Sequence, residues 1–212
     1  KRKGRKTERS EKERFTKEMV DFRERLTEAA DAERARRELA CPDPAEISRR
    51  VALPSTMLWE RRLGHADFLS LRAGVGDVPW RPPVPDVDVP ADAPDDLKGA
   101  LDEHALLPGS PVPVDLSEGG VVGIVGDRPA ALALARSLLC QAAILHGPAD
   151  LPMMVLARAD TAGAWDWVKW LPHTRDSSGS GRMLSSDPEM STRLVEGRLR
   201  AFLRTRICPD AR

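Results

Sequence analysis

The chain has 212 residues, and its 33 lysine and arginine side chains balance 33 aspartate and glutamate side chains. This length supports one α/β domain with an appendage, and the cancelled charge excludes a global field that would draw the whole chain to nucleic acid or a membrane. No run of eighteen apolar residues and no signal-peptide pattern occurs, so we expect the segment itself to be soluble. Three distant cysteines, Cys41, Cys140 and Cys208, match no metal or disulfide spacing, which indicates a reducing compartment.

The first 40 residues predict a long helical stalk. Residues 1–6 contain five basic side chains, a pattern that lies on the cytoplasmic side of a transmembrane helix in membrane proteins, with a solvated tail as the alternative. Residues 8–40 lack glycine and proline, and apolar residues recur in them every three or four positions among dense charge. We expect this narrow stripe to bind a partner protein, and packing on the chain's own domain is the alternative. The stripe consists of Phe15, Met19, Phe22, Leu26 and Ala30, of which the first four are the candidate partner-binding residues.

Residues 41–110 predict a helix break, a strand and an extended connector. Asp43 is a suitable N-cap, and Pro44 suits the first position of a short second helix. Residues 67–72 alternate as in a strand. The proline-rich stretch over residues 79–94 excludes a helix and predicts an extended connector.

From residue 111 onward, β-rich apolar runs alternate with helical patterns. This order predicts an α/β fold: a P-loop NTPase-like (Rossmann-like), mainly parallel sheet flanked by helices and preceded by the stalk. The pattern ends on a helix that would normally lead to another strand, so we expect the fold to be truncated at the C-terminus. The expected strands cover residues 112–116, 121–125, 152–157 and 182–184, and the expected helices cover residues 128–145, 164–170 and 187–206. The chain then divides into a juxtamembrane stalk over residues 1–52, a strand and connector over 53–110, and an incomplete, degenerate P-loop ATPase-like domain over 111–212.

The predicted strand-to-helix turn around Gly126 has the shape of a phosphate-binding loop without its usual side chains. If Gly126 is the first glycine of G-x-x-x-x-G-K-[ST], then Ala131, Leu132 and Ala133 replace the second glycine, the lysine and the hydroxyl. Neither the phosphate charge nor Mg²⁺ is then held, so we expect no ATP, no Mg²⁺ and no catalysis here. We expect the turn to be closed, with Leu132 buried against the sheet. A vestigial phosphate site, the alternative, would use Gly123, Gly126, Asp127 and Arg128.

Two further groups of side chains are interpreted as structural. Trp165, Trp167 and Trp170 with Lys169 have the composition of a nucleic-acid platform, but a lone cluster of this kind favours packing or protein contact. The four histidines have no companion at metal-ligand spacing and no acid placed for a catalytic triad. We expect structural or surface roles for His65, His104, His146 and His173.

Five sequence blocks, in matching order over nearly the whole chain, resemble one protein family. The family is EccC, the FtsK/SpoIIIE-type membrane ATPase of actinobacterial type VII (ESX) secretion systems. The blocks are Cys41-Pro42-Asp43-Pro44, Leu58-Trp59-Glu60-Arg61-Arg62, Asp67-Phe68-Leu69-Ser70-Leu71-Arg72-Ala73-Gly74, Gly123-Ile124-Val125-Gly126-Asp127-Arg128 and Trp167-Val168-Lys169-Trp170-Leu171-Pro172-His173.

The resemblance implies a stalk and a membrane-proximal domain of unknown function at the cytoplasmic face of the cell membrane. It implies that the segment couples the membrane complex to downstream ATPase domains of the same chain and so supports protein export. The implied partners are the ubiquitin-like domain of the EccD component, the EccB component and those downstream domains. The resemblance carries over no catalytic residue, because the family's Walker A lysine has no counterpart here.

Two other functions stay open on the sequence. An active P-loop ATPase would need an atypical lysine, for which Lys169 is the candidate, or a neighbouring subunit's residues. A DNA-tracking module is suggested by the FtsK-like resemblance and the basic start, but residues 8–40 mix ten acids with nine bases. An extended phosphate-binding face is therefore not expected, and we expect no nucleic-acid partner.

Overall fold

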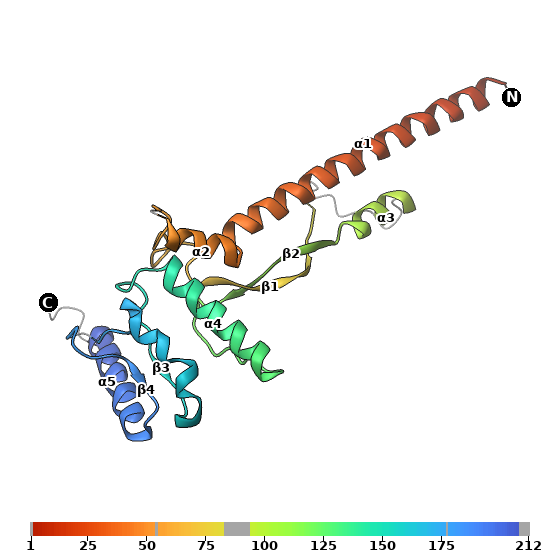
Figure 1. Cartoon of the computed structure of the whole chain (residues 1–212). Helices are drawn as coiled ribbons and strands as arrows, with labels where there is room; N and C mark the ends of the chain where they lie inside the picture. The colour runs from red at the N-terminus through yellow and green to blue at the C-terminus, as the bar shows by residue number, and fades with distance from the viewer. Residues whose placement is uncertain (1, 54, 83–93, 177, 208–212) are drawn as a thin grey trace. The chain divides into compact units, whose positions relative to one another are not determined.

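A computed structural model of the chain describes residues 2–53, 55–82, 94–176 and 178–207, with side chains described between residues 10 and 200. Two compact units alternate along the sequence (Figure 1). The first unit is Lys1–Ser48 with Ser70–Leu138, and the second is Arg49–Leu69 with Leu139–Arg212. The division expected from the sequence, into residues 1–52, 53–110 and 111–212, stays a prediction.

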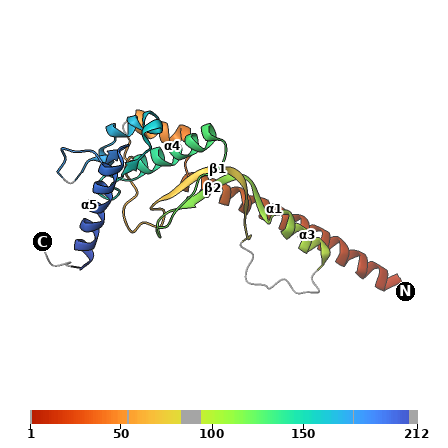
Figure 2. The ribbon, with the colours of Figure 1, turned by 90° about the horizontal axis from the view of Figure 1, so that it is seen from below.

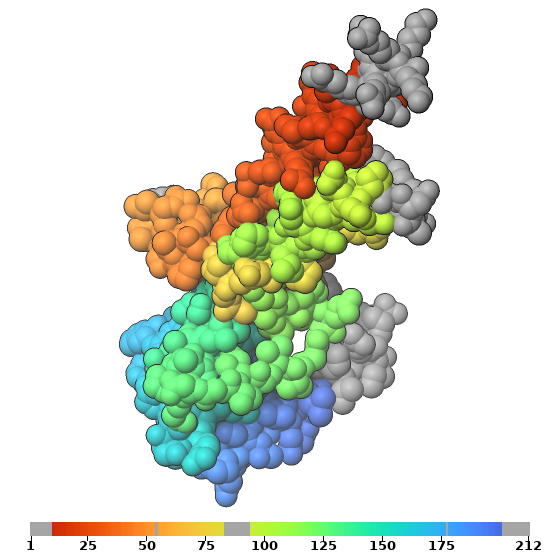
Figure 3. Space-filling view, turned by 90° about the vertical axis from the view of Figure 1, so that its right-hand side faces the viewer, coloured from red at the N-terminus to blue at the C-terminus, as the bar shows by residue number. Residues whose placement is uncertain are grey.

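The long helix predicted over residues 8–40 is confirmed and is continuous as α1 (Arg2–Ala40). Figures 1 and 2 both show α3 (Asp95–Glu103) lying alongside it, and Figure 3 shows the same part of the chain in yellow-green against the orange and red of α1. Leu26 and Ala30 are buried within the first unit. The C-terminal half of α1, which we call its lower half, therefore packs on the same unit.

The base of α1 is tied to the adjacent strand by an arginine. Arg72 donates from Nη1 to the Glu38 carboxylate at 2.6 Å and to the Cys41 carbonyl oxygen at 3.1 Å. Beyond this point α2 (Pro44–Ala52) begins as the sequence predicts, because the Asp43 carboxylate accepts the Glu46 N–H at 2.7 Å. The helix break and the predicted cap are confirmed.

The first unit has an antiparallel hairpin at its centre. β1 (Ser70–Pro79) pairs with β2 (Leu106–Asp115), and the buried side chains of Leu71 and Leu107 face its core. β1 runs seven residues past the predicted strand end, since its glycines lie at two register shifts that accommodate them as bulges. The α3 helix was not among the elements predicted from the sequence, and residues 83–93 of the predicted connector lie outside the described residues.

The helix of residues 128–145 is confirmed as α4 (Arg128–Leu145), but the strand predicted before it is not formed. Residues 121–125 form no regular secondary structure, and Val121 and Val125 are 99% and 97% exposed. A β-rich run becomes a strand only when another strand binds its backbone, and no described residue does so here. The prediction of a strand at this position is therefore wrong for this structure.

The second unit contains the only parallel pairing among the described strands. β3 (Val155–Leu156) pairs with β4 (Leu184–Ser185), and both are shorter than predicted. The mixed α/β class is confirmed, whereas the described residues form two two-stranded sheets in place of one mainly parallel sheet. The predicted helix near residue 164 appears as short 3-10 helices, η1 (Ala159–Ala164), η2 (Asp166–Trp170) and η3 (Pro172–Thr174). The last predicted helix is confirmed as α5 (Pro188–Ile207), which begins where the Asp187 carboxylate accepts the Met190 N–H at 2.8 Å.

One helix in the described part of the chain, α4, is long and apolar enough to cross a membrane by length and composition alone. Its residues Gln141, Ala142, Ala143 and Leu145 are buried in the protein. A core helix of a soluble protein meets the same criterion.

Candidate functional site

The degenerate phosphate loop is open to solvent, contrary to the expected closed turn. Gly123, Gly126, Asp127 and Arg128 are all exposed, and Leu132 is half-buried. The reason is the missing strand, since no sheet covers this end of α4 in the described residues. The loop keeps its left-handed glycine, Gly126 with φ 147°.

The turn is held by its own aspartate. The Asp127 carbonyl oxygen accepts the Ala131 N–H at 2.8 Å, and its carboxylate accepts the Ala130 N–H at 3.4 Å. A carboxylate therefore occupies the N-terminal turn of α4 where a bound phosphate would sit. Because Pro129 also lacks an N–H, the geometry disfavours an anion here.

The apolar stripe of α1 changes character along the helix. Leu26 is buried, Met19 and Phe22 are half-buried, and Phe15 is 37% exposed. The Arg25 guanidinium lies over the Phe22 ring at 6.0 Å from its centroid. A groove of about 240 Å³ opens on the exposed half; its lining is Phe15, Thr16, Met19, Val20, Arg23 and Asp96 of α3. The upper half of the stripe is thus the accessible part.

In the second unit, the last four carbonyl groups of α4 all accept hydrogen bonds. A helix end leaves these groups without partners inside the helix, so another part of the chain must supply the donors. Most of the donors come from residues 59–69, a segment that we call the clasp. The bonds are Trp59 N–H to Ile144 O (2.9 Å), Trp59 Nε1–H to Ala143 O (3.0 Å), Arg61 N–H to Leu145 O (3.0 Å) and His146 N–H to Ala142 O (3.2 Å).

The clasp is closed on itself by a buried arginine. Arg61 is 2% exposed; its Nε lies 3.1 Å from the Asp67 carboxylate, and its Nη1 donates to the Asp67 carbonyl oxygen at 3.2 Å. A second buried arginine, Arg50 at the end of α2, forms an ion pair with Glu60. Arg50 thereby holds the residue next to Trp59, and Arg61 holds the loop that runs on to Asp67.

His146 follows α4 directly and has both ring nitrogens engaged. Nδ1 lies 2.9 Å from the Ala142 carbonyl oxygen, which can only accept, so Nδ1 carries the proton. Nε2 accepts the Leu69 N–H at 2.9 Å with its lone pair and therefore carries no proton. The ring stands edge-on to Phe68 at 5.0 Å between centroids. This arrangement requires the neutral imidazole.

His173 in η3 is the second buried histidine. Its Nε2–H donates to the His146 carbonyl oxygen at 2.7 Å, and its own carbonyl accepts the Met153 N–H at 2.8 Å. Nδ1 is buried and has no hydrogen-bond partner in the described part of the chain. Desolvation lowers the pKa of both His146 and His173 below their usual value of 6.5, and the nearby Arg61 charge lowers that of His146 further.

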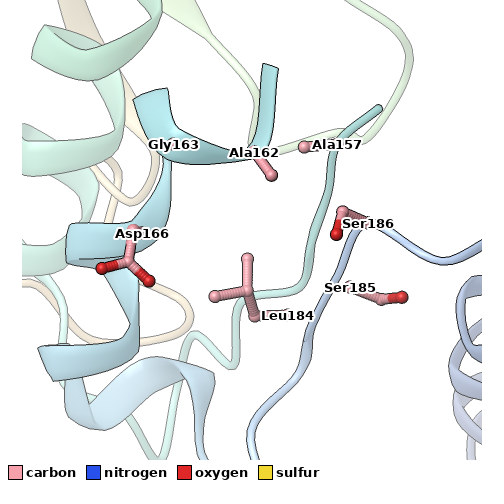
Figure 4. A pocket seen from close by; sticks show the side chains of 7 residues that line it. All are labelled: Ala157, Ala162, Gly163, Asp166, Leu184, Ser185 and Ser186. Atoms are coloured by element: carbon pink, nitrogen blue, oxygen red, sulfur yellow. The ribbon is translucent and has the colours of Figure 1, made fainter. Parts of the chain in front are cut away.

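A cleft of about 340 Å³ lies where β3 and β4 end (Figure 4). Open α/β sheets hold ligands at this edge. Figure 4 shows Leu184 in the middle, between the Asp166 carboxylate and Ser186. Asp166 pairs with Lys169 at 2.6 Å. The described residues include no group of three side chains able to hold a metal ion.

Comparisons with known proteins give consistent relatives. The ESX-4 secretion system protein EccC4 of Mycobacterium tuberculosis is 33% identical over 162 residues, which are 73% of this chain and 13% of that protein. The ESX secretion system protein EccC of Thermomonospora curvata is 31% identical over 185 residues, 81% of this chain and 14% of that protein. ESX-3 secretion system protein EccC3 of Mycobacterium tuberculosis is 30% identical over 179 residues, 79% of this chain and 13% of that protein. The chain belongs to the EccC family.

No family model matches the chain. The chain spans only 13% to 14% of the length of these EccC relatives. The EccC resemblance predicted from the five blocks is therefore confirmed. Three of them contribute to the end of α4: one holds Trp59 and Arg61, one holds Leu69, and one holds His173.

His146 and His173 are buried and hydrogen-bonded, which agrees with the structural roles expected for them, whereas the clasp has no counterpart among the sequence predictions. Trp59 and Arg61 belong to no periodic sequence pattern, because each is placed by a backbone N–H bond and by bonds of its own side chain. The available signal was indirect: α4 ends in a buried Leu145, so its carbonyls needed donors from elsewhere in this EccC chain. Among the tryptophans, Trp170 is 78% exposed and is available for protein contact.

Proposed function

We propose that this EccC segment is a membrane-proximal coupling domain of a type VII secretion ATPase, at the cytoplasmic face of the cell membrane. The observation that carries the proposal is the division of α1: its lower half is anchored in the first unit, and its upper half presents Phe15 and the adjoining groove to solvent. A helix that is anchored at one end and exposes an apolar stripe at the other transmits a contact made at its tip to the unit at its base.

The proposed partners are the EccD ubiquitin-like domain and the EccB component, together with the downstream ATPase domains of the same protein. Phe15, Met19 and Phe22 are the contact residues, whereas Leu26 serves the helix's own anchorage because it is buried. Charge supports a protein partner over nucleic acid, since acidic and basic side chains alternate on α1 and pair with one another, as Arg37 does with Glu33 at 2.7 Å.

We expect alanine substitutions in the exposed part of the stripe to weaken partner binding without unfolding the chain. Phe15→Ala combined with Met19→Ala and Phe22→Ala should weaken binding of an EccD ubiquitin-like domain at least tenfold in a calorimetric titration, because buried aromatic anchors dominate interface energies. Leu39→Ala is the matched control: Leu39 is an apolar residue of the same helix, 79% exposed and off the stripe. Equal affinities for the two variants would contradict the proposal.

We also propose that the segment keeps the frame of a P-loop ATPase and does no nucleotide chemistry. Residues 121–125 are β-rich, form no regular secondary structure and expose Val121 and Val125, which suits a strand that pairs only in the longer protein. Asp127 holds the turn, and the structure pairs Lys169, the candidate atypical lysine, with Asp166. No observation favours an active ATPase or a DNA-tracking module.

Millimolar ATP with Mg²⁺ should leave the thermal unfolding midpoint of this chain unchanged. A ligand that binds only the folded state at a hundred times its Kd stabilises it by about 2.7 kcal/mol, which a melting curve detects readily. Asp127→Asn serves as the comparison, since it removes the carboxylate from the turn. A rise of several degrees with the unaltered chain would show that the loop binds nucleotide.

A further inference from the structure

The clasp combines strained backbone with a bond that depends on a neutral ring. Trp59 and Leu69 have φ of 58° and 56°, a left-handed conformation that side chains other than glycine rarely adopt. Both residues donate backbone N–H groups to the end of α4, Trp59 to the Ile144 carbonyl and Leu69 to the His146 ring. These hydrogen bonds keep Trp59 and Leu69 in the strained conformation, so breaking one of them favours release of the segment.

We propose that residues 59–69 form a proton-controlled clasp, which is closed on the C-terminus of α4 while His146 and His173 are neutral and opens when they bind protons. This device goes beyond the coupling role and does not depend on it.

Protonation of His146 acts on the Leu69 bond directly. A second proton can enter only at Nε2, where it would face the Leu69 N–H, so an acceptor would become a donor opposite another donor. The Leu69 amide would then lose its partner, and its left-handed conformation would have nothing to hold it.

The surroundings of His146 oppose the charge. Arg61 of the clasp repels a second cation, and His173 does the same once it is charged. Asp67 attracts a cation, but its carboxylate is already paired with Arg61 at 3.1 Å. A proton on His146 would compete for Asp67 with the arginine that closes the clasp.

His173 adds a second point of control. A proton on its Nδ1 would place a cation in a buried position where the described residues offer no acceptor. Its Nε2–H bond ends on the backbone carbonyl of His146, so the His173 ring is tied to the residue that carries the first ring. Each ring binds a proton less readily when the chain is folded, so the clasp is most stable above pH 6.5, and its stability falls as the pH is lowered below that value.

The test is residue-resolved amide hydrogen exchange on the whole 212-residue chain at pH 7.5 and pH 5.0, expressed as protection factors. We expect protection of the Trp59, Arg61 and Leu69 amides to fall at least tenfold at the lower pH. Protection of the β1–β2 ladder should not change. Equal loss everywhere would indicate global unfolding, and unchanged clasp protection would indicate no proton control; either result overturns the proposal.

Two variants separate the histidine's charge from its packing. His146→Gln offers a donor and an acceptor that do not titrate, so most of the pH response of Leu69 protection should disappear, and the part that remains reports on His173. Leu69→Gly relieves the left-handed strain and should move clasp opening to lower pH, which provides a second test if the glutamine variant does not fold. His104→Gln in the first unit is the control and should behave like the unaltered chain. A pH response in His146→Gln equal to that of the control contradicts the proposal.

Discussion

Arg61→Ala should destabilise the second unit by about 3 kcal/mol, the lower end of the range for breaking a buried ion pair. The Arg61 side chain is 2% exposed and holds Asp67 through both its carboxylate and its carbonyl oxygen. Alanine would remove these contacts and leave an empty volume where the aliphatic stem packs. The Asp67 carboxylate reaches solvent, which keeps the loss at the lower end.

Urea unfolding followed by tryptophan fluorescence measures this loss. Four of the five tryptophans lie in the second unit, so the signal reports mainly on that unit. Arg62→Ala is the matched control from the adjacent position: Arg62 is 59% exposed, and its pair with Asp150 at 2.8 Å should contribute less than about 1 kcal/mol. If the two variants unfold at the same urea concentration, Arg61 does not close the clasp.

Leu107→Ala should destabilise the first unit by about 3 kcal/mol, as deletion of a fully buried leucine side chain does in other cores. Leu107 lies on β2, is 1% exposed and is paired in register with Val78 of β1. The same hairpin packs against α1, so the loss should also loosen the base of the stalk.

Amide exchange in the β1–β2 ladder measures the effect of Leu107→Ala on the stability of the first unit. Leu106→Ala is the control from the neighbouring position, since Leu106 is 50% exposed and should change stability by less than about 1 kcal/mol. Similar exchange rates in the two variants would show that the hairpin core does not support the first unit.

The helices were predictable because their signals are local. Asp43 and Asp187 cap α2 and α5 as their positions in the sequence indicate, the 3.6-residue pattern located α1, and a nearly continuous apolar run located α4. The family assignment was likewise accessible from short blocks. Its confirmation came from relatives of which this chain matches only a small part.

The strands were less predictable because a strand depends on its partner. Residues 121–125 have the composition of a strand but no described segment to pair with, whereas the glycine-containing end of β1 pairs with β2 through two bulges. The clasp escaped prediction for a related reason: Trp59 acts on carbonyl groups 84 residues away in sequence. Contacts of that range have no local signature.

We propose that the exposed half of α1 contacts other subunits of the secretion complex. The most direct measurement is photo-crosslinking in cells, with a photoreactive residue placed at Met19 or at Leu39 in the full-length protein. We predict crosslinks to EccD or EccB from position 19 and none from position 39, which is off the stripe. Crosslinks of equal yield from both positions, or none from position 19, would contradict the account.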